Sequence, residues 1–162
     1  MVDKNRVIQL IEEKLSDRMF IVDVSVSASN VIYVYVDSYD GITIDTCIEI
    51  SRHIEHSLDR DEEDFGLQVS SPGLMESFKV KEQYLKYTGK EVEVVTVSDD
   101  KFQGILKEAG EQSIVLETSS FEKPEGQKKK QLITKEYNFK YEEIKSAKAV
   151  ISFNKLMSDG KH

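Results

Sequence analysis

The chain has 162 residues, of which 39% are hydrophobic and 32% are charged. This composition supplies a folded core and excludes a disordered chain. No run of about 18 apolar residues occurs, which excludes a membrane-spanning helix. The N-terminus lacks the basic start and apolar stretch of a signal peptide. The single cysteine, Cys47, forms no internal disulfide. We therefore expect a protein of the reducing cytoplasm.

The net charge of −8 is unevenly distributed along the chain. Residues 1–78 contain 6 Lys and Arg against 16 Asp and Glu, a net charge of −10. Residues 79–162 contain 16 against 14, a net charge of +2. An acidic half is repelled by phosphate backbones and attracted to basic proteins. The asymmetry favours two domains and argues against simple wrapping of nucleic acid.

A helix and a β-hairpin are predicted at the start of the chain. Asp3 can cap the helix, whose apolar stripe contains Val7, Ile8, Ile11 and Leu15. Period-two alternation then begins near Phe20 and predicts a strand with Val22, Val24, Val26 and Ala28 on one face. After a turn at Ser29-Asn30, the returning strand places Ile32, Val34 and Val36 toward the core, with Tyr33 and Tyr35 on the other face.

A second helix and a third strand complete this half. Thr43 can cap the helix, and helical spacing relates Ile44, Cys47, Ile48, Ile54 and Leu58. Residues 59–64 then carry the chain across the surface to a strand over residues 65–70. The order helix, strand, strand, helix, strand predicts a two-layer α+β unit.

A proline-glycine turn closes the first half at Ser71-Pro72-Gly73-Leu74. Proline presets the first central position of a type II turn, and the second central position requires a positive φ. We therefore predict a positive φ at Gly73 and a change of chain direction.

Short strands dominate the second half. They are predicted at residues 92–97, 102–107, 113–117, 131–141 and 146–153, with a polar stretch over residues 118–130. Five short antiparallel strands in about 65 residues suggest a small closed β-barrel. The predicted organisation is an acidic α+β domain (1–78), a linker entering the barrel (79–90), the barrel (91–153) and a polar tail (154–162).

The segment from Leu67 to Leu74 resembles the Leu-Glu-Val-Ser-Ser-Pro-Gly-Leu signature of the ribosome maturation factor RimP family in seven of eight positions. Further similarity lies in order around it, at Cys47, at Ser51-Arg52 and Leu58-Asp59, at residues 87–92 and at residues 104–106. The chain departs from the family at Met75-Glu76-Ser77, where Asp-Arg-Pro is usual, and in a longer basic loop over residues 123–131.

The resemblance implies an N-terminal α+β domain and a C-terminal SH3-like, Sm-like barrel. It also implies a non-catalytic bacterial factor, without a cofactor, that binds the immature small ribosomal subunit through a basic ribosomal protein and nearby rRNA. We expect a cytoplasmic monomer with no membrane partner. The candidate partner-binding residues are Ser70, Ser71, Pro72, Gly73, Leu74, Lys128, Lys129 and Lys130.

Two catalytic or metal-binding alternatives compete with this interpretation. Ser70 or Ser71 could act as a nucleophile with His53 or His56 as base, but neither serine lies in a Gly-x-Ser-x-Gly elbow. The two histidines could share a metal, although the His-Glu-x-x-His spacing is absent. We expect no catalytic residue and no metal site.

Two further features have functional alternatives. The acidic run Asp61 to Asp64 lacks the spaced ligands and central glycine of a Ca²⁺ loop, so it is interpreted as a solvated connection that can steer a basic protein. Tyr33 and Tyr35 could stack on bases in a general RNA-binding module with a KH-like and an Sm-like half. The absence of a Gly-x-x-Gly loop and the acidic charge argue against that module.

Overall fold

The computed structural model describes residues 1–73, 76–123, 125–126 and 129–150. The chain forms two compact units that divide between Gly73 and Leu74. Among the described residues, no helix has the length and apolar character needed to cross a membrane.

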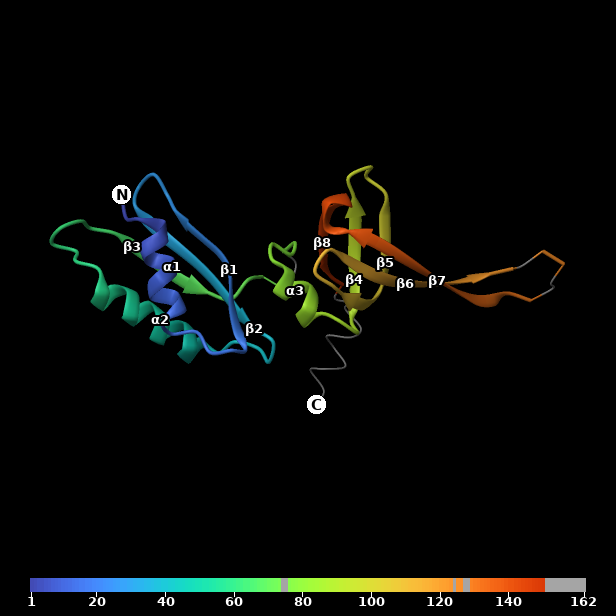
Figure 1. Ribbon diagram of the computed structural model, residues 1–162, viewed down its shortest axis with the longest axis horizontal. Coiled ribbons are helices and arrows are strands. Elements are labelled where there is room, and N and C mark those ends of the chain that lie inside the picture. Colours follow the sequence, from blue (N-terminus) through green and yellow to red (C-terminus); the bar gives the residue numbers. More distant parts are fainter. Residues whose placement is uncertain (74–75, 124, 127–128, 151–162) are drawn as a thin grey trace. The chain divides into compact units, whose positions relative to one another are not determined.

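The first unit has two layers, with its helices on one side of a three-stranded sheet (Figure 1). Its elements are α1 (Lys4–Glu12), β1 (Met19–Val26), β2 (Val31–Ser38), α2 (Ile44–Ser57) and β3 (Gly66–Ser70). The predicted element order is therefore confirmed. Both predicted caps also form: the Asp3 carboxylate accepts from the Asn5 N–H, and the Thr43 hydroxyl accepts from the Thr46 N–H.

The strand order in this sheet is β1-β2-β3. β1 and β2 pair as an antiparallel hairpin, and Asn30 has a positive φ of 61° in the turn between them. β2 and β3 are parallel, so a crossover is needed between them, and α2 supplies it. β3 consequently lies at an edge of the sheet.

The core of the first unit lies between the sheet and both helices. Ile32, Val34 and Val36 are fully buried, as the alternation predicts, and Tyr33 and Tyr35 are half-buried on the opposite face. Ala28 is exposed, contrary to expectation, because β1 ends at Val26 and Ala28 lies in the turn.

The predicted apolar stripe of α2 is wrong at two positions. Its buried residues are Cys47, Ile50 and Ile54, whereas Ile44 is 80% exposed and Ile48 is 41% exposed. The buried face follows the spacing of three and four residues from Cys47. Because α2 turns this face to the sheet, Ile44 and Ile48 point away from the core.

The second unit contains one short helix and a five-stranded antiparallel sheet. Its elements are α3 (Lys81–Lys86), β4 (Glu91–Thr96), β5 (Lys101–Ala109), β6 (Ser113–Glu122), β7 (Gln131–Lys140), a 3₁₀ turn (Tyr141–Glu143) and β8 (Ile144–Ala149). Asp99 has a positive φ of 66° in the turn between β4 and β5. β6 extends into the stretch from Thr118 that the sequence predicted as a polar loop.

α3 lies in the segment predicted as a linker. Val80, at its N-cap, has no side chain that accepts a hydrogen bond, so the usual start signal is absent. The Gln83 side chain instead reaches back to the start of the helix, where its Oε1 accepts from the backbone N–H of Lys79 at 2.5 Å and of Val80 at 3.1 Å. Burial raises the pKa of the neighbouring Tyr84 hydroxyl to about 12.

The predicted closed barrel does not form among the described residues. The strands follow the order β7-β6-β5-β4-β8, with β7 and β8 at the two edges and no ladder joining them. The β6–β7 ribbon projects beyond the other strands (Figure 1). β5 pairs with β6 only as far as Glu117, so the outer part of the ribbon is two-stranded among the described residues. The coarser prediction of an α+β protein with a second, β-rich half is confirmed. The core of this half contains Val92, Val94, Leu106, Ile114 and Leu116.

Candidate functional site

An apolar groove lies between α2 and the edge strand β3. The α2 side includes Ile44, Cys47, Ile48 and Ser51, and the β3 side includes Leu67, Val69, Ser70 and Ser71. The groove has a volume of about 450 Å³, and no charged side chain lines it. Such a surface favours apolar side chains of a partner rather than a phosphate or a metal ion.

The backbone of β3 provides hydrogen-bonding groups along the open edge of the sheet. The Gly66 N–H donates to the Asn30 carbonyl at 3.1 Å, on the β2 side. Successive residues of a strand turn their N–H and C=O groups to opposite edges, so Gln68 and Ser70 also face β2. Leu67 and Val69 therefore present their N–H and C=O groups to the open edge.

The signature turn follows directly on this strand. Ser70 and Ser71 line the groove, while Pro72 is half-buried and Gly73 is exposed. Leu74 lies outside the described residues. The positive φ at Gly73 stays a prediction. The described part of the signature thus forms the edge strand and one side of the groove.

The described residues that line the groove show no sign of an activated nucleophile. Its lining contains Ser70 and Ser71 but no histidine, so no Ser-His pair forms there. Burial raises the pKa of the Cys47 thiol, which lowers the fraction of reactive thiolate at neutral pH.

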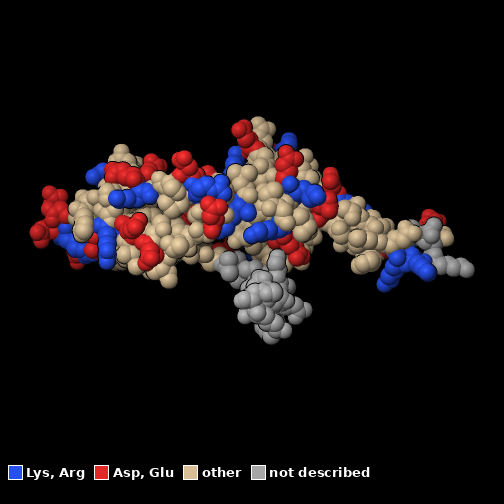
Figure 2. Space-filling model, turned by 90° about the horizontal axis from the view of Figure 1, so that it is seen from below, with Lys and Arg blue, Asp and Glu red and all other residues tan. Residues whose placement is uncertain are grey.

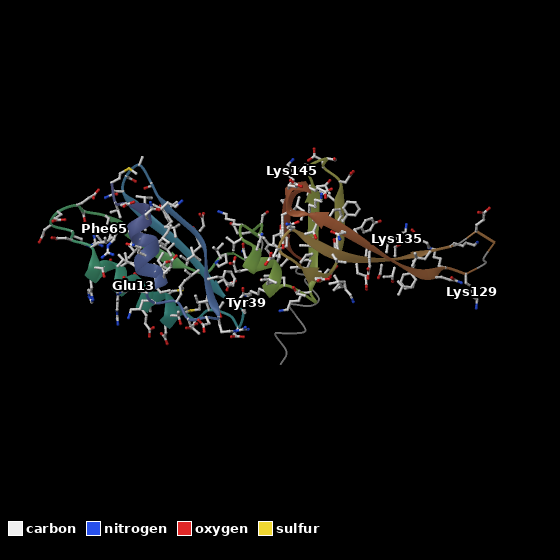
Figure 3. The ribbon with its side chains drawn as sticks, viewed as in Figure 1. Glu13, Tyr39, Phe65, Lys129, Lys135 and Lys145 are labelled. Carbon is white, nitrogen blue, oxygen red and sulfur yellow. The ribbon has the colours of Figure 1, made fainter. Side chains whose placement is uncertain are left out.

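The two histidines line a different and smaller hollow of about 260 Å³. Glu13 lies at the end of α1 (Figure 3). Its Oε2 atom is 2.8 Å from the Nε2 atom of His53. Lys14 and Arg52 share the hollow and disfavour a bound cation. Within the described ranges, no three His, Cys, Asp or Glu side chains are placed to hold a metal ion.

Part of the acidic run is occupied in local contacts. The Asp64 carboxylate accepts from Arg60 at 3.0 Å, and Glu63 accepts from the Asn30 side chain at 3.2 Å. Arg60 also lies over the Phe65 ring, at 4.3 Å from its centroid. These contacts hold the segment that leads into β3.

The two tyrosines of β2 lie on the sheet face that carries no helix. The β2–β3 register places Tyr33 beside Gln68 and Tyr35 beside Ser70. Within the described residues, no lysine or arginine from these three strands lies on this face, since the neighbouring positions of β1 are Asp23 and Ser25. The cationic groups that would accompany base stacking on an RNA are missing from these strands.

The basic loop caps a separate feature, the distal part of the β6–β7 ribbon. We call residues 119–134 the arm. Lys129 lies at its far end and Lys135 borders its base (Figure 3). Lys123, Lys129 and Lys130 are exposed, as is Glu125, and basic side chains lie near an acidic one at the tip (Figure 2). Lys128 lies outside the described residues.

The arm also exposes an apolar pair that the sequence pattern does not predict. Phe121 and Leu132 are direct cross-strand partners and are 71% and 58% exposed. Leu132 lies in a segment of the predicted strand, but Phe121 lies in the predicted polar loop. Only the extension of β6 to Glu122 brings the two side chains together.

Comparison with known proteins assigns the family. Residues 8–75 match the RimP N-terminal domain. A ribosome maturation factor RimP from Porphyromonas gingivalis is 36% identical over 152 residues, covering 93% of this chain and 100% of the relative. The factor of the same name from Christiangramia forsetii is 36% identical and covers 93% of this chain and 99% of the relative. The ribosome maturation factor RimP from Flavobacterium psychrophilum is 32% identical and covers 94% of this chain and 100% of the relative.

The fold and the match over α1 to β3 define an α+β protein with a RimP-type N-terminal domain. The similarity to the relatives extends over nearly the whole chain. This chain belongs to the ribosome maturation factor RimP family.

Proposed function

We propose that this protein is a non-catalytic, cytoplasmic assembly factor that binds the immature small ribosomal subunit and assists its maturation. Membership of the family supports a role in ribosome maturation. The binding target, the absence of catalysis, the location and a monomeric state are parts of the proposal.

The distribution of charge is the observation that carries the proposed mode of binding. Residues 1–73 contain 6 Lys and Arg against 15 Asp and Glu, a net charge of −9. A surface of this sign attracts a basic ribosomal protein and repels misplaced RNA. The lysines at the tip of the arm have the opposite sign and suit rRNA phosphates. The first unit and the arm therefore bind different components of the subunit.

Sedimentation of a cell lysate through a sucrose gradient tests the proposal. The protein is expected to comigrate with free small subunits and to be absent from translating ribosomes. Recovery only at the top of the gradient would contradict the proposed target.

A lysine variant tests the contact with rRNA. Lys129→Ala together with Lys130→Ala should weaken binding to purified immature small subunits about tenfold, because each lysine neutralises one phosphate. The salt dependence, expressed as the slope of log affinity against log salt, should fall by about one per lysine.

The matched control removes two exposed lysines elsewhere in the second unit, with Lys101→Ala and Lys140→Ala. The control should leave both affinity and slope close to those of the unmodified protein. Equal losses in the two variants would mean that the arm makes no specific contact.

General RNA binding is the second candidate function. The exposed Phe121 and the lysines of the arm favour it, because aromatic and basic groups together bind single strands. Binding to naked RNA as tight as to the small subunit would support this alternative.

A further inference from the structure

The exposed isoleucines of α2 lie above the β3 edge of the sheet, beside which no strand lies among the described residues. Ile44 and Ile48 are one helical turn apart, and both line the groove that also contains Leu67 and Val69 of β3. The core of the first unit uses neither isoleucine as a buried member. An apolar strip beside strand-edge backbone groups that no described strand pairs is the arrangement that strand-adding partners use.

We propose that this groove binds an extended, basic polypeptide segment, which adds to the sheet as a fourth strand beside β3. The N–H and C=O groups of Leu67 and Val69 would pair with the backbone of the added segment. Every second side chain of that segment would enter the groove beside Ile44 and Ile48. These side chains would be apolar. The intervening side chains would point to the helix-free face of the sheet.

Charge determines the class of the partner. The first unit carries a net charge of −9, so lysine or arginine is favoured at the intervening positions. The neighbouring side chains on the helix-free face include Gln68 and Ser70, which offer no competing cation. An RNA strand is disfavoured because no basic side chain lines the groove.

The inference deepens the proposed function, and it rests on that function for the source of the segment, a ribosomal protein with a basic extended region. The groove itself can be tested without ribosomes. If the peptide does not bind, the groove proposal is wrong, but comigration with small subunits would still support the proposed function. If the protein does not comigrate with small subunits, the proposed function is wrong, but peptide binding would still support the groove.

The first test uses the full chain and a synthetic peptide of alternating lysine and valine, about eight residues long, which is a common length for a strand. A peptide with the same residues in two blocks, all lysines and then all valines, is the control for charge. The alternating peptide should bind at least tenfold more tightly. Equal affinities would overturn the proposal, because charge alone would then explain binding.

Amide exchange followed by NMR reports on the strand edge. The alternating peptide should slow exchange at the N–H groups of Leu67 and Val69. The N–H groups of Gln68 and Ser70 already face β2 and should change much less. A bound state with no protection at Leu67 and Val69 would exclude strand addition.

The variant Ile44→Asp tests the groove. Its carboxylate lies in the first turn of α2, where negative charge favours the helix, so the fold should persist. Electrostatics alone would tighten binding of a basic peptide, whereas loss of the apolar contact should weaken it about tenfold. The control Gln9→Glu adds the same charge at an exposed position of α1 and should not weaken binding.

Unchanged or tighter peptide binding by Ile44→Asp would overturn the proposal. So would binding of a single-stranded oligouridine that competes with the peptide and is weakened by the same substitution, because the groove would then be a nucleic-acid site.

Discussion

Gly104 lies in β5 against the backbone of β6, with no room for a side chain. A Cβ atom there would overlap the carbonyl oxygen of Glu117 and would lie 2.9 Å from its carbonyl carbon. It would also lie 3.1 Å from the Cα atom of Thr118. Because these neighbours are backbone atoms of a paired strand, relief requires the strands to separate.

Gly104→Ala should therefore destabilise the second unit by about 2 kcal/mol or more, within the usual cost of overpacking. Denaturant unfolding, followed by a probe in that unit, measures the change. Gln103→Ala, at the neighbouring exposed position, is the control and should cost less than about 1 kcal/mol. Equal stability of Gly104→Ala and the unmodified protein would mean that β6 can move away freely.

Ile44 shows at the residue scale why helical spacing alone misplaces a side chain. It is spaced correctly for a stripe with Cys47 and Ile48, yet it is 80% exposed. Burial of a helical residue requires a partner surface as well as the right angle on the helix. α2 turns its Cys47, Ile50 and Ile54 face to the core, and among the described residues no strand lies beyond β3, so Ile44 stays exposed.

At the scale of elements, the arm is a ribbon without a core. Buried side chains of the second unit occur in β6 only up to Leu116, and its outer residues are exposed from Ser119 onward. Thr118 and Lys135 are cross-strand partners at its base. We therefore expect the arm to contribute little to the stability of the second unit.

Replacing residues 119–134 with an Asn-Gly turn should leave the second unit folded, because two-residue turns of this kind close antiparallel strands. The free energy of unfolding should change by less than about 1 kcal/mol, as expected for changes away from the core. Denaturant unfolding measures it. A loss well above this value would show that the arm supports the sheet.

At the scale of the whole molecule, the described residues form two separate hydrophobic cores. The core cluster of the first unit contains only residues between Val2 and Val69. The core cluster of the second contains only residues from Phe78 to Ala147. Separate cores allow the two units to fold independently.

A fragment of residues 1–73 should accordingly fold in isolation. It retains all five elements of the first unit, including the parallel β2–β3 pair. A dispersed NMR spectrum and a cooperative thermal transition are the expected results. An unfolded fragment would show that the first unit requires the remainder of the chain for its stability.

The local pattern of the sequence determined the element order of the first unit and most of its core. Alternation at Ile32, Val34 and Val36, and caps at Asp3 and Thr43, act between residues close in the chain. The signature from Leu67 to Leu74 likewise indicates the family through the order of its residues alone.

Only the tertiary structure decided which strands pair and where the sheets end. The parallel β2–β3 pairing, the open edge at Leu67 and Val69, and the unclosed sheet of the second unit depend on contacts between distant segments. α3 escaped prediction because Gln83 caps it from within the helix. The candidate groove follows from the same physical reason: the exposure of Ile44 and Ile48 depends on which face of α2 meets the sheet and on where the described sheet ends, and no local periodicity encodes either.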